Sequence, residues 1–282
     1  MATTIAISGK GGSGKTTLAA MFIRSLLARA GGVRPCQSVS SKSVSVRVPP
    51  KAGAVLAVDA DPNSCLGLTL GVQPVGTIAD IREDARAKPA SNTGMDRLRT
   101  FEYGMQQAIT EAAGFDLLTM GRPEGPDCYC AVNNMLRRFL DQLSSQYQYV
   151  IIDNEAGMEH LSRRTTNNVD LLCIIAEPTS LGVLTAQRIF ELAKELPIVI
   201  KHIGVIWNNT LPIDDYRLTI ENRKSEIENI ETFGCVPFDE SVFNASMRGK
   251  TIFDLDENSP AFLAVQKILK DKLNLNSVAR AL

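Results

Sequence analysis

The chain has 282 residues, and its 30 lysine and arginine residues nearly balance its 31 aspartate and glutamate residues. This length can hold one large α/β domain or two small ones, with a hydrophobic core that needs no disulfides for stability. The net charge of −1 gives no sign of a nucleic-acid partner or of an anionic membrane, and no apolar run reaches the roughly 20 residues of a membrane-spanning helix.

The six cysteines do not form a disulfide framework in a chain of this length. They indicate a reducing compartment, and we expect a cytoplasmic protein. Cys65, Cys173 and Cys235 lie in apolar or motif contexts, so we expect them to be small buried residues.

Short β-rich runs alternate with helical stretches along the chain. The alternation predicts an α/β fold, a mostly parallel twisted sheet flanked by helices on both faces, in a single domain over residues 1–282. A Ser/Pro-rich segment at about 31–53 interrupts the pattern, and we expect it to be a surface insertion. The predicted strands are Thr3–Ser8, Ala54–Asp59, Phe115–Met120, Tyr149–Asp153, Leu171–Ala176, His202–Asn208 and Thr232–Val236. The predicted helices are Lys15–Ala30, Met95–Ala113, Val132–Ser145, Ser180–Glu195, Ile213–Ile227 and Pro260–Leu273.

The first predicted strand leads into the sequence SGKGGSGKTT, which contains the phosphate-loop pattern G-x4-G-K-[ST]. Its glycines allow backbone N–H groups to surround phosphate oxygens, and the following helix presents its positive N-terminus to the same anion. We expect Lys15 to bridge the β- and γ-phosphates and the Thr16 hydroxyl to coordinate Mg²⁺. The residues expected to bind the nucleotide here are Gly11, Gly12, Ser13, Gly14, Lys15, Thr16 and Thr17.

A second lysine, Lys10, stands too early in the loop to reach the β- and γ-phosphates of its own nucleotide easily. We infer that it acts on a second nucleotide across a dimer interface, where it neutralises charge in the transition state. The loop resembles that of the deviant Walker A ATPases, whose KGGxGKT sequence carries such a lysine. The resemblance extends over nearly the whole chain apart from the insertion. It implies the P-loop NTPase fold, Mg²⁺-dependent hydrolysis of ATP to ADP, and a homodimer that encloses two nucleotides.

Two further strands deliver carboxylates to the edge of the sheet where ligands bind in open α/β folds. The second strand ends at Asp59 and Asp61. A D-x-D pair alone is more often a turn or a helix cap, but after a phosphate loop we expect the pair to belong to the nucleotide site. The resemblance implies that Asp61 positions the attacking water and that Asp59 lies near the magnesium ion. It also implies that Asp153 holds Mg²⁺ through water and that Gly157 presents its N–H to the γ-phosphate.

Two segments later in the chain resemble the family's adenine-binding region. Asn208 and Asn209 follow a predicted strand, and in relatives an asparagine there hydrogen-bonds the adenine edge. For each asparagine alone, a turn residue is nearly as good an interpretation. The segment GCVPFDES matches the loop whose backbone borders the adenine, which assigns Val236, Pro237 and Phe238 to the base.

Cys128 and Cys130 form a C-x-C pair in a loop rich in glycine and proline. Two thiolates bind one soft metal ion but fill only half of a tetrahedral or square-planar site. Neither of the two histidines, His160 and His202, adjoins this loop. A two-fold axis completes the site, because two chains together supply four sulfurs to one soft metal ion.

The C-x-C pair, together with KGGSGKTT, DADPNSCLG and AGMEHLSRRT, resembles the nickel-insertion ATPases of the CooC type. The resemblance implies a nickel chaperone whose client is carbon monoxide dehydrogenase or acetyl-CoA synthase, with one Ni²⁺, for which Zn²⁺ competes, held by Cys128 and Cys130 of both chains. From the near-neutral charge we expect neither a nucleic-acid nor a membrane partner.

Three alternatives remain open at this point. One is an iron–sulfur reductase ATPase of the nitrogenase iron-protein type, although there the two cysteines lie on separate loops. Another is a spatial-organising ATPase of the MinD or ParA type, for which the amphipathic C-terminal segment would have to bind a membrane. We expect that segment to pack on the sheet instead. A third is a nickel store that binds ATP only structurally.

Overall fold

The computed structural model describes residues 2–29, 55–87, 103–122, 140–156, 168–210 and 230–279 of the chain. Within them, strands and helices alternate from the N-terminus onward. The strands are β1 (Thr3–Gly9), β2 (Val55–Ala60), β3 (Thr110–Glu111), β4 (Phe115–Thr119), β5 (Tyr149–Asn154), β6 (Asn168–Ala176), β7 (Val199–Thr210) and β8 (Glu231–Pro237). The helices are α1 (Lys15–Arg29), α2 (Cys65–Thr69), α3 (Ile78–Ala87), α7 (Ser180–Glu195), α9 (Glu240–Met247) and α10 (Pro260–Ala279), with a 3₁₀ helix η1 (Ile252–Asp254).

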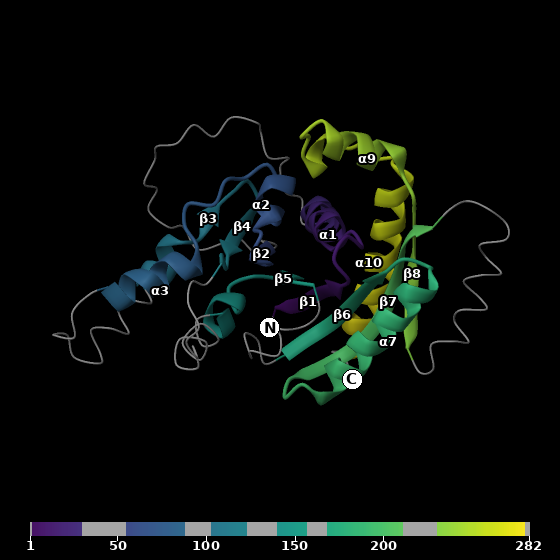
Figure 1. The fold of residues 1–282 in the computed structure, drawn as a ribbon, viewed down its shortest axis with the longest axis horizontal. Helices are drawn as coiled ribbons and strands as arrows, with labels where there is room; N and C mark the ends of the chain where they lie inside the picture. Colours follow the sequence, from purple (N-terminus) through teal and green to yellow (C-terminus); the bar gives the residue numbers. More distant parts are fainter. Residues whose placement is uncertain are drawn as a thin grey trace.

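The described strands form one twisted sheet with the order β3-β4-β2-β5-β1-β6-β7-β8 (Figure 1). Every neighbouring pair is parallel except β3 and β4, which are antiparallel at the edge of the sheet. The central position of β1 is visible in its register, because Ile5 lies opposite both Ile151 of β5 and Leu171 of β6. Strands buried on both sides in this way are typical of parallel sheets with helices on both faces.

Helices cover the two faces of this sheet. Side chains of α1, α2 and α10 pack on one face, and those of α3 and α7 pack on the other. Along β1 the side chains alternate between the layers: Ile5 and Ile7 join the α1–α10 side, and Ala6 joins the α7 side. This arrangement confirms the predicted architecture.

A buried arginine ties the helix that follows the phosphate loop to the C-terminal part of the chain. Arg24 of α1 donates from Nη1 to the carbonyl oxygen of Ile252 at 2.8 Å, and its guanidinium lies 4.3 Å from the centre of the Phe262 ring. Both contacts are favourable, since a guanidinium needs hydrogen-bond acceptors when it is buried and is attracted to an aromatic face.

One predicted helix extends too far toward the C-terminus. The helix expected over Met95–Ala113 is helical at residues 103–107, but Thr110–Glu111 form β3 instead. The cause is a tight turn at Gly114, which has a φ of 90°. The Ala112 N–H donates to the Phe115 carbonyl across this turn at 2.9 Å, so that β3 and β4 make a hairpin.

The short helices α2, α3 and α9 were not predicted from the sequence. The helix predicted over Ile213–Ile227 and the insertion at 31–53 lie outside the described residues, as does most of the helix predicted over Val132–Ser145; residues 140–144 are helical, as expected. In the described part of the chain, none of the helices has the length and apolar character needed to cross a membrane.

Candidate functional site

The predicted site residues gather at the carboxyl ends of the central strands. In the register of the sheet, Asp59 of β2 lies opposite Asp153 of β5, and Asp153 lies opposite Ile7 of β1, just before the phosphate loop. Three strands that are far apart in the sequence therefore bring both carboxylates beside the loop. Open parallel sheets bind their ligands at this edge.

The phosphate loop leaves β1 in close contact with the neighbouring strand. A side chain at Gly9 would place its Cβ 2.3 Å from the carbonyl oxygen of Ile175, so only glycine fits there. The loop then turns back, with the Ser13 N–H donating to the Lys10 carbonyl oxygen at 3.2 Å. Helix α1 begins at Lys15, directly after this turn, which places its N-terminal amides at the loop.

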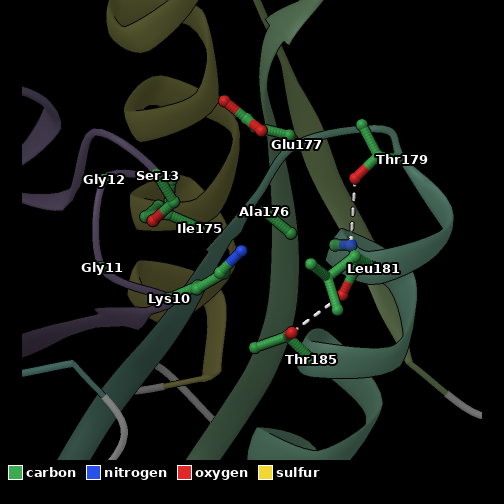
Figure 2. A pocket seen from close by; sticks show the side chains of 11 residues that line it. Lys10, Gly11, Gly12, Ser13, Ile175, Ala176, Glu177, Thr179, Leu181 and Thr185 are labelled. Atoms are coloured by element: carbon green, nitrogen blue, oxygen red, sulfur yellow. Dashed lines mark hydrogen bonds between the residues drawn. The ribbon is translucent and has the colours of Figure 1, made fainter.

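The two lysines of the loop point in different directions. Lys15 is 6% exposed, and its Nζ donates to the carbonyl oxygen of Lys10 at 3.1 Å, so its charge lies inside its own loop. The side chain of Lys10 is exposed and lines a small pocket of about 120 Å³ between the loop and the start of α7. Figure 2 shows its amine extending toward Ala176 of β6 rather than back over Ser13.

Asp153 is a buried carboxylate that lies beside Thr16 and Lys15. It is 1% exposed, and among the described residues neither of its oxygens has a partner with normal hydrogen-bond geometry. Burial raises its pKa from 3.8 to about 7, and the nearby Asp59 adds to the rise, whereas Thr16 and Lys15 oppose it. A carboxylate in this condition requires a cation or a proton.

Asp59 is also fully buried, but backbone N–H groups hold its carboxylate. Its oxygens accept from the Leu66 N–H at 2.9 Å and from the Asp61 N–H at 3.3 Å. Burial nevertheless raises its pKa to about 6. These bonds connect the end of β2 to the beginning of α2, so Asp59 also shapes the segment that carries Asp61.

Asp61 lies partly exposed at the rim of the site. Its Oδ1 accepts from both the backbone N–H and the side-chain amide of Asn63, each at 2.8 Å. This turn fixes the carboxylate at the surface of the site, where water has access to it.

The segment after β5 is described as far as Ala156, so Gly157 lies outside the described residues. Asn154 is fully buried and donates from Nδ2 to the carbonyl oxygen of Ile7 at 2.9 Å. It therefore secures β1 just before the phosphate loop. A Cβ added to Gly11 would lie 4.0 Å from the Cβ of Ala156, which places the start of this segment against the loop.

The residues assigned to the adenine lie together at the ends of β7 and β8. Thr210 pairs with Pro237, and the N–H of Phe238 donates to the Thr210 carbonyl at 2.9 Å. The Phe238 side chain is 47% exposed. Asn209 is also exposed, whereas Asn208 is buried and faces the phosphate loop.

The cysteines differ in part from expectation. Cys173 is buried, as predicted, and burial raises the pKa of its thiol to about 12, so it stays protonated. Cys65 and Cys235 are exposed, which corrects the prediction of burial. Both lie at surface positions of their elements, Cys65 at the first residue of α2. Cys128 and Cys130 lie outside the described residues.

Comparison with known proteins places this geometry in a family, although no family model matches the chain. The chain is 38% identical over 276 residues to an uncharacterised ATP-binding protein, MJ0685, of Methanocaldococcus jannaschii, across 96% of this chain and 98% of that protein. It is 30% identical over 269 residues to the carbon monoxide dehydrogenase accessory protein CooC of Rhodospirillum rubrum, across 91% and 90% of the two chains. The septum site-determining protein MinD of Pyrococcus horikoshii, solved with Mg-ADP, shares the fold with a TM-score of 0.65 at 20% identity, across 99% of this chain and 98% of that one. The chain belongs to the MinD/ParA-type family of P-loop ATPases.

As a MinD/ParA-type P-loop ATPase, the protein binds and hydrolyses ATP. The site fits a Mg²⁺ ion, because the buried carboxylate of Asp153 lies beside Thr16. Within the described ranges no three or more His, Cys, Asp or Glu residues gather closely enough to hold a metal. A site with few carboxylates beside a phosphate loop suits Mg²⁺, which usually takes one or two carboxylates and completes its shell with phosphate oxygens and water.

Glu177 lines the pocket but was not among the site residues predicted from the sequence. Glu177 directly follows β6, lines the pocket with Lys10, and accepts from the side-chain amide of Asn209 at 3.3 Å. Its position after a parallel strand was a usable signal, because β6 ends at the same edge of the sheet as β1.

Proposed function

We propose that this ATPase is a nickel chaperone that dimerises with ATP and inserts Ni²⁺ into the active-site cluster of carbon monoxide dehydrogenase or acetyl-CoA synthase. The supporting observation is the similarity to CooC, which extends over nine-tenths of both chains. The C-x-C pair, Cys128 and Cys130, adds a ligand set suited to a soft divalent ion.

In this proposal Lys15, the loop amides and the N-terminus of α1 hold the phosphates, and Thr16 with Asp153 and Asp59 forms the Mg²⁺ side of the site. The ion supplies charge neutralisation on the phosphate oxygens. Asp61 orients the water that attacks the γ-phosphate, a task for which its surface position is favourable. Gly157 presents its N–H to the same phosphate.

Lys10 acts in trans on the nucleotide of the partner subunit. The position of its side chain supports this role, because it is exposed and extends into the pocket beside α7, while Lys15 occupies the interior of the loop. A cation provided by the second subunit couples hydrolysis to dimerisation, since neither active site is complete alone.

Nickel is the cargo of this dimer. Cys128 and Cys130 of each chain supply two thiolates, and the two-fold axis brings four together around one ion. ATP hydrolysis then loosens the interface and divides the four sulfurs between two separating chains, which releases the ion to the client.

Among the alternatives, membrane attachment through the C-terminal helix is disfavoured. The apolar stripe of α10 is buried in the hydrophobic core, where Phe262, Val265 and Leu269 are 2%, 0% and 1% exposed. Over the described side chains of α10, which end at Leu273, this stripe is committed to the core and is not offered to a lipid surface.

The test is transfer of nickel to a client. Nickel-free carbon monoxide dehydrogenase is incubated with the nickel-loaded ATPase and Mg-ATP, and its activity is followed over time. We expect activation with ATP, none with a non-hydrolysable ATP analogue, and none with the Cys128→Ser, Cys130→Ser double variant. Equal activation by that double variant would remove the support for a chaperone role.

A further inference from the structure

Two buried side chains tie β1, the strand that leads into the phosphate loop, to its neighbours. At the beginning of β1, the Thr4 N–H donates to Oδ2 of Asp170 in β6 at 2.8 Å. Toward its end, the Ile7 carbonyl oxygen accepts from Nδ2 of Asn154 in β5 at 2.9 Å. Asp170 and Asn154 are 6% and 0% exposed, so both bonds are shielded from water.

Asn154 is an unusual residue for its place in the strand. It ends the apolar run of β5 and is fully buried, a position at which strands normally carry an apolar side chain. Burial of an amide costs free energy unless its polar groups are hydrogen-bonded. The Oδ1 of Asn154 has no partner among the described residues, so the bond from Nδ2 to the Ile7 carbonyl offsets only part of this cost.

Asn154 and its neighbour Asp153 point to opposite faces of the sheet. Ile151 packs in the layer of α1 and α10, Ile152 packs in the layer of α7, and side chains alternate along a strand. Asp153 therefore faces α1, where it lies beside Thr16, and Asn154 faces α7. Asn154 is thus no ligand for an ion between Asp153 and Thr16, and it acts on such an ion only through the backbone.

The hydrogen bond of Asn154 joins the two strands that a magnesium ion would connect. Asp153 belongs to β5, whereas Thr16 belongs to the helix that follows β1 and the phosphate loop. Ile7 lies directly opposite Asp153, two residues before the end of β1. The amide therefore fixes one strand end against the other at the level of the ion. This distance matters because Mg²⁺ requires ligands at about 2.0–2.1 Å in nearly octahedral geometry.

We propose that Asn154 is a positioning residue that couples Mg²⁺ to ATP binding, because it holds the β5 carboxylate at the distance from the phosphate loop that one ion can bridge. The inference rests on the proposed Mg²⁺ role of Asp153 and is independent of nickel delivery. The bond between Thr4 and Asp170 provides the matched comparison, since it ties down the same strand at the end remote from the loop.

The experiment measures the affinity for a non-hydrolysable ATP analogue by calorimetry, with Mg²⁺ and with EDTA, and the ratio of the two affinities is the Mg²⁺ enhancement. Asn154→Leu keeps most of the side-chain shape but removes the donor. We expect its affinity in EDTA to stay within about twofold of the wild-type value and its Mg²⁺ enhancement to fall roughly tenfold. Asn154→Ala repeats the measurement if the leucine variant does not fold.

Asp170→Ala is the control at the other end of β1. It should lower the urea midpoint, because the buried Thr4 N–H loses its acceptor, and it should keep the wild-type Mg²⁺ enhancement. Asp153→Asn tests the assignment on which the inference rests, and it should lose the enhancement.

The outcomes separate the inference from its basis. The role of Asn154 is overturned if its variants keep the wild-type Mg²⁺ enhancement, or lose affinity equally with and without Mg²⁺, while Asp153→Asn loses the enhancement. Full enhancement in Asp153→Asn would instead overturn the proposed Mg²⁺ role of Asp153.

Discussion

Buried carboxylates dominate the site at the scale of single residues. Asp59 and Asp153 are 0% and 1% exposed, and their pKa values are about 6 and about 7. Asp59 accepts backbone hydrogen bonds that partly offset its burial, whereas neither Asp153 oxygen has a partner with normal hydrogen-bond geometry among the described residues. Asp153 is therefore the residue at which protons and Mg²⁺ compete most directly.

The first prediction concerns the pH dependence of stability without nucleotide and Mg²⁺. Because burial raises the pKa of Asp153 above its ordinary value of 3.8, the folded protein favours the protonated form. The stabilising contribution is complete below about pH 4 and is lost as the pH rises through about 7. We expect Asp153→Asn to remove this loss and to raise the free energy of unfolding at pH 8 by on the order of 2–4 kcal/mol.

Urea unfolding between pH 5 and pH 8 measures this effect. Asp271→Asn, which alters an exposed carboxylate of α10, is the control and should follow the wild-type curve. An Asp153→Asn protein that loses stability with rising pH as steeply as the wild type does would contradict the assignment.

The second prediction separates the two lysines of the loop. Lys15→Ala removes the cation inside the loop, so we expect tight ATP binding to disappear in calorimetry. Lys10→Ala leaves the loop interior intact, so ATP should still bind, while hydrolysis falls roughly 10²- to 10³-fold and sedimentation shows less ATP-dependent dimer. Equal loss of ATP affinity in both variants would mean that Lys10 serves its own nucleotide.

At the scale of elements, the central strands β1, β2, β5 and β6 were predictable because each is a largely apolar run that is buried on both faces, whereas the edge strand β3 was expected to be helical. The site aspartates were found for the same reason, since each ends such a run. Two of the short helices, α2 and α9, were missed because they have only five and eight residues, which is too short for a helical apolar period to be recognised in the sequence. The contact of Asn208 with Ser13 could not be predicted either, because it joins residues 195 positions apart.

The third prediction tests the packing of α10, whose apolar stripe was expected to cover the sheet. Phe262 is 2% exposed and contacts Arg24, so Phe262→Ala opens a cavity and should lower the free energy of unfolding by about 3–5 kcal/mol. Its neighbour Leu263 is 46% exposed, and Leu263→Ala should change stability by less than about 0.5 kcal/mol. Similar effects of both variants in urea unfolding would argue against a structural role for the stripe.

At the scale of the whole molecule, the proposed function depends on two chains acting together. In that proposal the exposed Lys10 acts on the nucleotide of the partner, and the two thiolates of each chain are joined by two from the partner. One two-fold dimer would meet both requirements and would link ATP to nickel. The sequence predicts this coupling of ATP and nickel binding from Lys10 of the phosphate loop and from the C-x-C pair.

The most direct measurement is a nickel titration with and without Mg-ATP, with the mass of the complex determined at each point. We expect one Ni²⁺ per two chains, tighter binding when ATP holds the dimer together, and weaker binding as the pH falls, because the thiols must lose their protons. The Cys128→Ser, Cys130→Ser double variant should keep its ATPase activity and bind no nickel. Retention of one Ni²⁺ per dimer by that variant would contradict the proposed site and, with it, the nickel-delivery function.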